Sequence, residues 1–364
     1  MLFLAATLPK PEFEVRFLLL WERGAWAAEA DALGVPVHVL GLRPQDCVGL
    51  RLQCVAAAML ALRRYLALTR RVDIVDAWLV PSFTFAGFAQ PVARVPVLIA
   101  GRRSLLGLYR RKSWFRRAAA AWATRRVDAV VANSRAAARE AISEERIDPS
   151  RVHVIPNAVV GAVSLPGERE RRRLEWGFGP DDVVVGCVAN YKPGKGLEAL
   201  LETASRLREP APRVRYVFVG DGPLRERLQA DIHKRQLQSV VVLNGKEDDA
   251  RLLYPAFDIV VQASESEGLP NVVLEAAAAG LAIVATDVGG TGDVVTNETD
   301  GLLVPKGDAD ALTSAIRRLA ENPDLRGRLG RAAERRSGDF SPGQLTEKTA
   351  ALYRRLLRER RRAS

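Results

Sequence analysis

In the second half of the chain, short runs of β-branched and other apolar residues alternate with longer segments whose apolar residues recur every three or four positions. The short runs predict strands at 183–189, 214–219, 240–243, 259–262, 282–286 and 302–304. The periodic segments predict helices at 197–208, 224–235, 250–256, 271–279 and 309–320. Runs that are apolar at successive positions indicate strands buried on both faces, so the alternation predicts a parallel sheet with helical crossovers.

The first half shows the same alternation less regularly, with strands predicted at 14–20, 35–40, 73–79, 95–100, 128–133 and 152–155. One long helix is expected at 50–69. Between the halves, residues 161–180 are rich in Gly, Pro and charge, which favours a linker. We therefore expect an α/β protein with two doubly wound domains, 1–160 and 181–340. Such domains bind ligands beside the carboxyl ends of their strands, so a cleft is expected where these ends face each other.

Composition agrees with two ordinary domains, because 364 residues with 48% hydrophobic and 27% charged content can bury two cores. Arg63 and Arg64 interrupt the most apolar segment, 55–68, so no transmembrane helix is expected. The first residues lack the basic region of a signal peptide. Three cysteines and three histidines show no metal-ligand spacing, so we expect no metal, no disulfide framework and a cytoplasmic location.

The net charge of +11 is partly local, because residues 101–126 contain nine basic residues and no acidic one. In this stretch Leu108, Phe115 and Trp122 recur every seven residues beside the basic side chains Arg110, Arg111, Lys112, Arg116 and Arg117. A basic amphipathic helix of this kind can lie on an anionic membrane, and the arginines at 354–362 could add to the attraction. The alternative is a helix packed on its own domain with a solvated basic face. Nucleic acid is not an expected partner, since no recognition motif is present.

The most informative segment runs from Ser264 to Gly280 and reads SESEGLPNVVLEAAAAG. A strand ends near Ala263, Gly268 and Pro270 predict a tight turn, and a helix begins at about Asn271. The first amides of a helix lack partners and carry the positive end of its dipole, so an anion or a sugar hydroxyl can bind there. The carboxylates of Glu267 and Glu275 can accept hydrogen bonds from vicinal hydroxyls. Alternatively, both are ordinary exposed acids.

The run EGLPNVVLEA, followed by AGLAIVATDVGG and TDGLLVP, resembles the signature of glycosyltransferase family 4, in which the two glutamates form an E-x7-E motif. The resemblance continues in VANYKPGKG at 188–196, FVGDGPL at 218–224 and VIPNAV at 154–159. These pieces stand in the order and at the spacing of the family and cover nearly all of 127–306. The resemblance implies the GT-B fold and retaining transfer of a sugar from a nucleotide-diphosphate sugar to a glycan or lipid-linked acceptor.

The resemblance also implies roles for individual residues. Lys195 resembles the lysine that neutralises the donor diphosphate, Glu275 the residue that binds the ribose hydroxyls, and Glu267 the one that contacts the transferred sugar. Where the family often has an arginine, this chain has Asn190, and Lys192 is a nearby substitute. Preorganised positive groups stabilise the leaving diphosphate, so neither a metal nor another cofactor is expected. The remaining expected donor contacts are Gly220, Gly222, Asn244, Gly245, Lys246, Gly268, Leu269, Pro270 and Asn271.

In the first domain, the resemblance implies an opening strand and a glycine-rich loop, and we expect both to be missing here, with 2–8 as a helix. Asp76 and Arg103 are expected to follow strand ends, where they could line the acceptor side of the cleft, or else be a capping acid and a surface base. Relatives that use lipid-linked acceptors act at the inner membrane face, so peripheral membrane attachment is an expectation. The helix at 341–364 is expected to pack back on the first domain.

Two other functions remain open at this point. The missing loop favours a catalytically impaired scaffold that binds nucleotide sugars or membranes. A nucleotide-sugar epimerase has the same architecture and would convert the donor without an acceptor. The sequence does not identify the donor base, the sugar, the acceptor or the oligomeric state.

Overall fold

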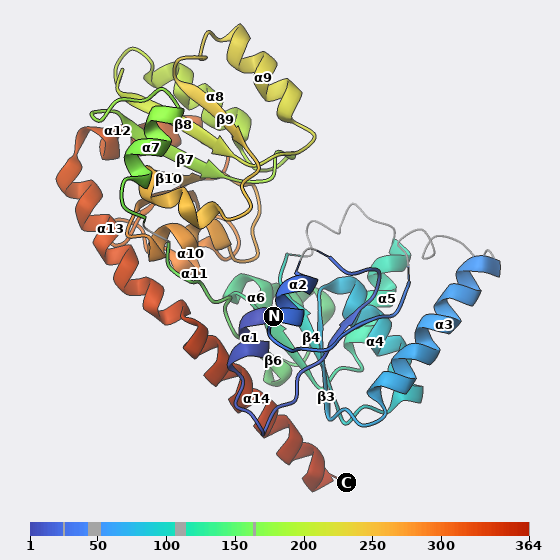
Figure 1. Ribbon diagram of the computed structural model, residues 1–364. Coiled ribbons are helices and arrows are strands. Elements are labelled where there is room, and N and C mark those ends of the chain that lie inside the picture. The colour runs from blue at the N-terminus through green and yellow to red at the C-terminus, as the bar shows by residue number, and fades with distance from the viewer. Residues whose placement is uncertain (25, 43–51, 106–113, 163–164, 364) are drawn as a thin grey trace. The chain divides into compact units, whose positions relative to one another are not determined.

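The computed structural model describes residues 1–364 except 25, 43–51, 106–113, 163–164 and 364. The chain forms two compact units (Figure 1). Unit 1 contains Met1–Ala158 together with Pro342–Ser364, and unit 2 contains Val159–Ser341. The last helix therefore belongs to the unit that the first half of the chain builds.

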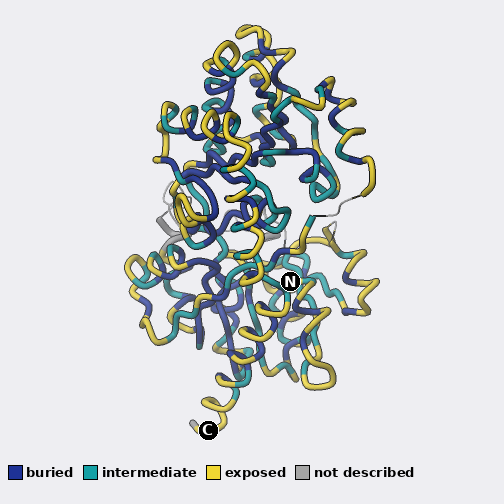
Figure 2. The backbone as a smooth tube through the Cα atoms, turned by 90° about the vertical axis from the view of Figure 1, so that its left-hand side faces the viewer, coloured by how far each residue is buried: buried dark blue, intermediate teal, exposed yellow. Residues whose placement is uncertain are grey.

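Unit 2 has a six-stranded parallel sheet in the order β12-β11-β10-β7-β8-β9. Its strands coincide closely with the apolar runs and span Val183–Val188 (β7), Val214–Val219 (β8), Val241–Gly245 (β9), Ile259–Gln262 (β10), Ala282–Thr286 (β11) and Leu302–Val304 (β12). Both faces are covered, so successive residues of one strand enter different cores: Val185 packs on one side and Val184 on the other. In Figure 2 the interior of unit 2 is mostly buried tube, with exposed segments around it. The continuous apolar runs follow from this double burial.

The helices of unit 2 mostly follow the periodic segments. They span Leu197–Leu207 (α8), Arg225–Lys234 (α9), Asn271–Ala278 (α10), Thr291–Val294 (α11), Ala309–Glu321 (α12) and Pro323–Ser337 (α13). The predicted helix at 250–256 is instead two short 3₁₀ turns, Ala250–Leu252 (η4) and Tyr254–Ala256 (η5). Pro255 accounts for this difference, since it lacks the amide that a continuous α-helix would use.

The expected linker at 161–180 is partly a structured element of unit 2. It contains helix α7, Glu168–Glu175, whose Arg173 donates to the carbonyl of Ala256 and pairs with Asp258 at 2.6 Å. Trp176 stacks on Phe257 with ring centroids 5.8 Å apart. The Gly, Pro and charge content that favoured a linker therefore reflects turns on either side of a short, strongly charged helix.

Unit 1 is also built of parallel strands flanked by helices. β1 (Phe17–Leu19) pairs with β2 (Val37–Val39), and a separate sheet has the order β3-β4-β5-β6. The latter strands span Ile74–Trp78, Val97–Arg102, Ala129–Ala132 and Val152–Val154. Its helices are α1 (Leu2–Thr7), α2 (Ala27–Ala32), α3 (Leu52–Thr69), α4 (Val80–Ala93), α5 (Trp114–Thr124) and α6 (Arg135–Glu145). With two parallel-sheet, Rossmann-like units, the architecture is the expected GT-B fold.

The last helix, α14 (Pro342–Ala363), packs on unit 1 beside α1 and β4. Its buried side chains Leu345, Leu352 and Leu356 share a core with Val97 and Ile99 of β4. Arg354 forms an ion pair with Glu12. Hydrophobic burial therefore holds α14, the C-terminal helix, against the N-terminal part of the chain in unit 1.

The basic segment at 101–126 is only partly described. Leu108, Arg110, Arg111 and Lys112 lie outside the described residues, as do the side chains of Phe115, Arg116 and Arg117. Trp122 on α5 is half-buried and stacks on Phe88 of α4, with ring centroids 4.3 Å apart. The described part of this helix therefore packs on its own unit. None of the described helices has the length and apolar content needed to cross a bilayer.

Candidate functional site

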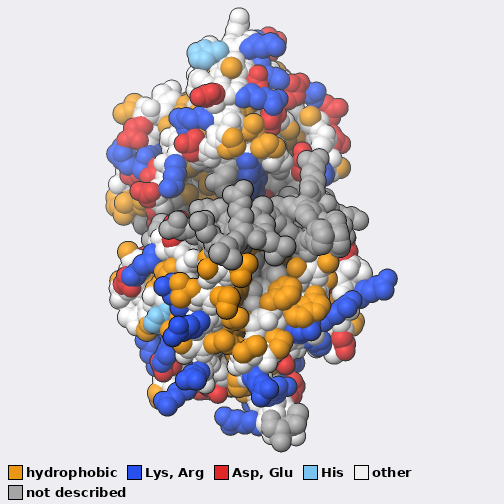
Figure 3. Space-filling model, turned by 90° about the vertical axis from the view of Figure 1, so that its right-hand side faces the viewer, with side chains coloured by type: hydrophobic (Ala, Val, Ile, Leu, Met, Phe, Trp, Pro, Cys, Tyr) orange, Lys and Arg blue, Asp and Glu red, His pale blue; other side chains and the backbone are white. Residues whose placement is uncertain are grey.

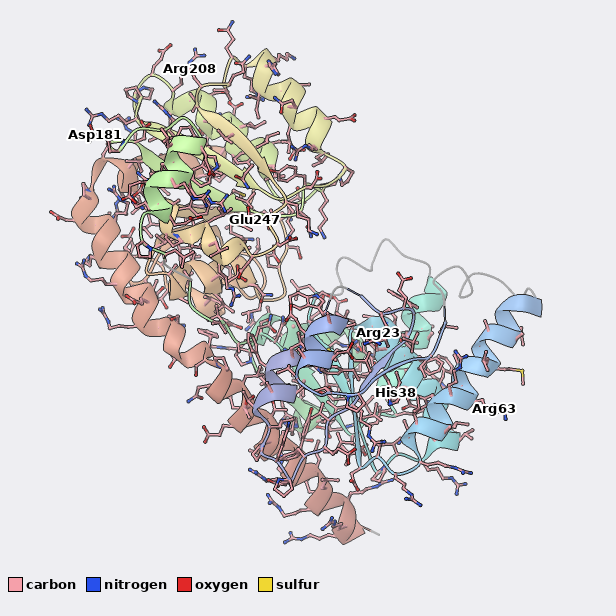
Figure 4. The ribbon with its side chains drawn as sticks, in the orientation of Figure 1. Arg23, His38, Arg63, Asp181, Arg208 and Glu247 are labelled. Carbon is pink, nitrogen blue, oxygen red and sulfur yellow. The ribbon has the colours of Figure 1, made fainter. Side chains whose placement is uncertain are left out.

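The expected site residues of unit 2 cluster at one edge of its sheet. These residues lie at the carboxyl ends of strands β7, β8, β9 and β10 or in the segments that follow them. In Figure 4, Glu247, which follows β9, lies toward the opposite end of unit 2 from Asp181 and Arg208, which lie before β7 and β8. β7 and β10 are neighbours in the sheet although the strand order reverses between them. Open parallel sheets bind ligands at this switch point.

Lys195 and Glu267 meet at the switch point. The Lys195 ammonium, in the segment after β7, donates to Glu267 Oε1 at 2.6 Å, in the segment after β10. The side chains are 22% and 17% exposed, so the pair is partly shielded but still reachable from solvent. The amide of Gln262, the last residue of β10, also approaches Glu267 Oε1, at 3.4 Å. An ammonium and a carboxylate are thus held side by side where a ligand of this fold would bind.

Backbone contacts hold these two segments together. The amide of Glu265 donates to the carbonyl of Gly194 at 2.9 Å. Gly196 has φ +71°, and a Cβ built there would lie 2.0 Å from the carbonyl oxygen of Ala263. Only glycine fits such a position, because any side chain would separate the two segments. Lys195 therefore stands on a backbone whose path is tightly fixed.

The glycines after β8 have a packing role within unit 2. A Cβ on Gly220 would lie 2.0 Å from the carbonyl oxygen of Ala189, and one on Gly222 would lie 2.6 Å from that of Tyr191. Tyr191 is fully buried, and its hydroxyl donates to the carbonyl of Phe218 at 2.7 Å. The close approach at these glycines is made by the segment after β7. Its effect is to fix that segment against β8.

Helix α10 begins at the same edge of the sheet. Its N-cap residue, Pro270, supplies no side-chain hydrogen bond to the first turn. Gly268, Leu269 and Pro270 are buried, whereas Asn271 is exposed. The start of α10 therefore presents the positive end of a helix dipole beside the Lys195–Glu267 pair.

Glu275 lies about one turn inside α10 and has its own partner. The Tyr254 hydroxyl donates to Glu275 Oε2 at 2.7 Å. Burial raises the pKa of Glu275, opposed by this hydrogen bond and by the positive charge of Arg251. No contact among the described residues joins Glu275 to Lys195 or Glu267. The structure therefore pairs two of the three expected key residues directly and gives the third a separate environment.

Tyr254 and Gln262 were not expected as site residues. Tyr254 is fully buried in η5 and orients Glu275, while Gln262 is buried at the end of β10 and approaches Glu267. Only the position of Gln262 at a strand end could have suggested it from sequence.

The remaining expected residues of unit 2 lie along the same edge. Asn244 Oδ1 accepts a hydrogen bond from the Trp176 indole at 2.9 Å, and the carbonyl of Gly245 accepts one from Gly220 at 2.8 Å. Asn190, Lys192 and Lys246 are exposed. Strand order places Asn244 two strands away from β7, about 10 Å at ordinary strand spacing.

In unit 1, Asp76 and Arg103 come from adjacent strands. Asp76 lies inside β3 and does not follow it as expected, whereas Arg103 directly follows β4. The Tyr353 hydroxyl of α14 donates to Asp76 Oδ2 at 2.7 Å, and the Arg103 guanidinium lies 3.8 Å from the centre of the Trp78 ring. Burial raises the pKa of Asp76 and lowers that of Arg103. Neither is therefore the solvated residue that the alternative interpretation described.

Within the described parts of the chain, no three His, Cys, Asp or Glu side chains gather in a way that could hold a metal ion. Cys187 is buried, which raises the pKa of its thiol to about 12. This thiol is therefore protonated at neutral pH and is not a reactive nucleophile.

Two family models match the chain. The family described as glycosyl transferases group 1 matches residues 168–336, and glycosyltransferase family 4 matches residues 1–160. A D-inositol 3-phosphate glycosyltransferase of Segniliparus rotundus is 30% identical over 237 residues, 64% of this chain and 53% of that protein. The putative glycosyltransferase EpsD of Bacillus subtilis is 31% identical over 188 residues, 52% and 49% of the two chains. The chain thus spans about half the length of the curated relatives that it matches.

Solved structures extend the similarity over both units. Anabaena HepE in complex with UDP and glucose is similar with a TM-score of 0.82 and 22% identity, covering 96% of this chain and 94% of that one. Sucrose-phosphate synthase from Thermosynechococcus elongatus is similar with a TM-score of 0.72 and 20% identity, covering 89% and 84%. At these identities the structures show a shared fold.

Proposed function

This chain belongs to glycosyltransferase family 4, the group 1 glycosyl transferases, and we propose that it transfers a sugar from a nucleotide-diphosphate sugar to a glycan or lipid-linked acceptor. One observation carries the proposal: Lys195 Nζ and Glu267 Oε1 lie 2.6 Å apart where the strand order of unit 2 reverses. A positive group for phosphate and an acidic group for sugar hydroxyls are both present where this fold binds nucleotides.

The donor would lie along the carboxyl edge of the sheet. Its sugar and distal phosphate would bind at the segment after β10 and the start of α10, beside Lys195. Its nucleoside would extend across β7 and β8 toward Asn244 at the end of β9. Strand order supports this direction, because two strand spacings, about 10 Å, separate β7, which leads into the segment of Lys195, from β9, which carries Asn244. HepE, whose solved complexes contain UDP, has a similar fold, so uridine diphosphate donors are the first to test.

Departure of the leaving group places negative charge on a diphosphate. In the proposed reaction the Lys195 ammonium turns from Glu267 toward that charge, and the amides that open α10 face it. Such preorganised donors can contribute roughly 3–4 kcal/mol each to transition-state stabilisation. These groups would meet the charge without a metal ion. We further propose that Glu267, released from Lys195, contacts the transferred sugar, and that transfer retains the anomeric configuration.

Glu275 is proposed to bind the ribose hydroxyls. Hydrogen bonds from two vicinal hydroxyls require a carboxylate, which accepts at both oxygens. Burial raises the pKa of Glu275, and the hydrogen bond donated by Tyr254 opposes this rise, so it favours the carboxylate form. Tyr254 is therefore a positioning residue in this proposal.

Asp76 and Arg103 of unit 1 are proposed as residues that bind the acceptor. Their contacts with Tyr353 and Trp78 leave them little freedom, and Asp76 Oδ1 and Arg103 Nε are buried without a hydrogen-bond partner. Such groups usually find partners in native proteins. A polar acceptor group, or water that it orders, could supply them.

A binding and turnover series tests the proposal. Thermal shift against UDP-, GDP- and ADP-sugars identifies the donor base, and donor hydrolysis or transfer to simple glycan and lipid acceptors then measures turnover. A raised melting temperature with nucleotide release supports a glycosyltransferase. Binding without turnover would instead indicate a scaffold, and interconversion of the donor sugar without nucleotide release would indicate an epimerase. Absence of any nucleotide-sugar binding would contradict the proposed site.

A further inference from the structure

We propose that Asn244 selects the base of the nucleotide donor. It favours a base with a carbonyl oxygen on its pairing edge, uracil or guanine, over the base of the same size with an amino group there, cytosine or adenine. This selection rests on the proposed function, because it needs a nucleotide at the carboxyl edge of the sheet in unit 2. It adds the residue that distinguishes one base from another and the kind of hydrogen bond by which it does so.

A bulge at the end of β9 sets the position of Asn244. Phe218 of β8 is paired with Leu243, and the next residue of β8, Val219, is paired with Gly245. Asn244 is therefore the extra residue of β9, outside the regular pairing. A bulge redirects the side chain of its extra residue and is frequent next to functional sites. β9 is an edge strand of the six-stranded sheet, so the bulge disturbs no second neighbour.

Trp176 fixes the orientation of the Asn244 amide. Its indole N–H donates to Asn244 Oδ1 at 2.9 Å. An indole nitrogen can only donate, so the amide oxygen, and not the amide nitrogen, faces it. Asn244 Nδ2 has no hydrogen-bond partner among the described residues and is not fully enclosed by them. The amide therefore offers a ligand its N–H donors, while its oxygen is already engaged.

Close packing holds Trp176 in turn. Only 9% of its surface is exposed, and its ring stacks on Phe257 with centroids 5.8 Å apart. Phe178 adds a tilted contact, with ring centroids 6.3 Å apart. The indole cannot turn away from the amide without disturbing these contacts. The Asn244 amide is thus held in one of its two possible orientations.

The same aromatic cluster also positions Glu275. Tyr254 contacts Phe257 edge to face, with ring centroids 6.0 Å apart, and its hydroxyl donates to Glu275. Asn244 and Glu275 are therefore held by the two ends of one row of rings, Trp176, Phe257 and Tyr254. The base and the ribose are adjacent groups of one nucleoside. A base at Asn244 is thus compatible with the ribose proposed to bind at Glu275.

The direction of a hydrogen bond separates bases that charge does not separate. Figure 3 shows Lys and Arg side chains mixed with Asp and Glu side chains on the face of unit 2 that it views. Such charges act on the diphosphate, which every nucleotide-diphosphate donor carries. Uracil and cytosine differ by a carbonyl oxygen and an amino group at the same place, as do guanine and adenine. A fixed N–H donor bonds to the carbonyl oxygen, whereas an amino group facing it leaves both groups unpaired.

The test compares two pairs of nucleotides whose bases have equal size. Isothermal titration calorimetry of the full chain measures the dissociation constants of UDP and CDP, and of GDP and ADP. In the pair that binds more tightly, the carbonyl member should bind about tenfold more tightly than the amino member, because the mismatched base leaves polar groups unpaired. Asn244→Asp keeps an acceptor for the Trp176 indole but replaces the free donor with an acceptor, so it should reverse this preference.

Matched variants separate base selection from charge and packing. Gln229→Glu makes the same chemical change on the exposed surface of α9 and should leave both ratios unchanged. Trp176→Phe removes the indole donor, so the amide can turn and the preference should largely disappear. Phe178→Leu loosens the same aromatic cluster but keeps the indole, so stability should fall while the preference remains.

Three results would overturn the selection by Asn244. They are tighter binding of the amino member by the unchanged chain, equal binding within both pairs, and unchanged ratios in Asn244→Asp. In each of these cases nucleotide binding itself would still support the proposed donor site. If none of the four diphosphates binds, the donor site is wrong, and the selection fails with it.

Discussion

Lys195 Nζ and Glu267 Oε1 lie 2.6 Å apart although 72 residues separate them in the chain. The contact exists because β7 and β10 are paired, which brings the segments after both strands to one edge. The ion pair with Glu267 holds the Lys195 ammonium in position. It also weakens the attraction of this ammonium for a second anion, because the Glu267 carboxylate already balances its charge. In the proposed reaction a diphosphate takes the place of Glu267 as its partner, so the pair is the resting state of the site.

Replacing Lys195 with Gln should reduce sugar transfer by about a hundredfold or more, the usual effect of removing one preorganised donor from a developing negative charge. Steady-state kinetics with saturating donor measures the loss. Lys234→Gln, on the exposed surface of α9, is the matched control and should leave turnover unchanged. Equal kinetics in all three proteins would remove Lys195 from the mechanism.

Replacing Tyr254 with Phe should act on donor binding through Glu275. The change removes the hydrogen bond that opposes the raised pKa of Glu275, so this pKa should rise further. Donor binding needs the carboxylate form of Glu275. When the pH is lowered, the Tyr254→Phe variant should therefore lose donor binding at a higher pH than the unchanged chain does. The pH dependence of donor KM measures this shift, whereas a purely structural effect would change KM equally at every pH.

Glu275 also makes a prediction about stability. A carboxyl whose pKa is raised by folding binds more protons in the folded chain than in the unfolded one, so stability falls as pH rises through the interval from its ordinary value of 4.5 to the raised value. Glu275→Gln removes this titration. Relative to Glu275→Gln, the unchanged chain should therefore lose stability as pH rises through that interval. Urea unfolding at several pH values measures the difference, and a constant difference would contradict the expected burial effect.

Gly196 and Gly307 offer a paired test of backbone packing. Both have positive φ, +71° and +76°, but a Cβ on Gly196 would lie 2.0 Å from the Ala263 carbonyl oxygen, whereas a Cβ on Gly307 meets nothing within 4 Å. Gly307→Ala should cost about 1 kcal/mol for the left-handed backbone alone. Gly196→Ala should cost several times more and weaken donor binding, because Lys195 must move. Urea unfolding compares the two, and equal costs would be inconsistent with the tight contact.

Tyr353 and Tyr65 provide a similar pair in unit 1. Tyr353→Phe leaves the buried Asp76 Oδ2 without its donor and should destabilise unit 1 by about 1–3 kcal/mol. The Tyr65 hydroxyl is buried without a hydrogen-bond partner, so Tyr65→Phe should be neutral or stabilising. Hydrogen exchange of the amides of unit 1, measured in the full chain at increasing urea concentrations, compares the stability of the two variants with that of the unchanged chain. A neutral Tyr353→Phe would indicate that Asp76 is protonated or hydrated.

The sequence by itself determined the strands and most helices of unit 2, because segments such as Val183–Val188 are buried on both faces and are therefore apolar at every position. It also determined the family, because the order and spacing of the motifs can be read directly from the sequence. It failed at 250–256, where Pro255 interrupts a helical pattern, and at 161–180, where a charged helix resembles a linker.

Only the tertiary structure decided which side chains meet. The contacts Lys195–Glu267, Tyr254–Glu275 and Asp76–Tyr353 join residues 72, 21 and 277 positions apart. Hydrophobic periodicity reports which face of an element is buried, but not which element covers it. Strand order and register decide that, and these depend on the burial of the whole sheet. The sequence therefore shows which types of residue the site contains, whereas the folded chain decides which of their side chains are in contact.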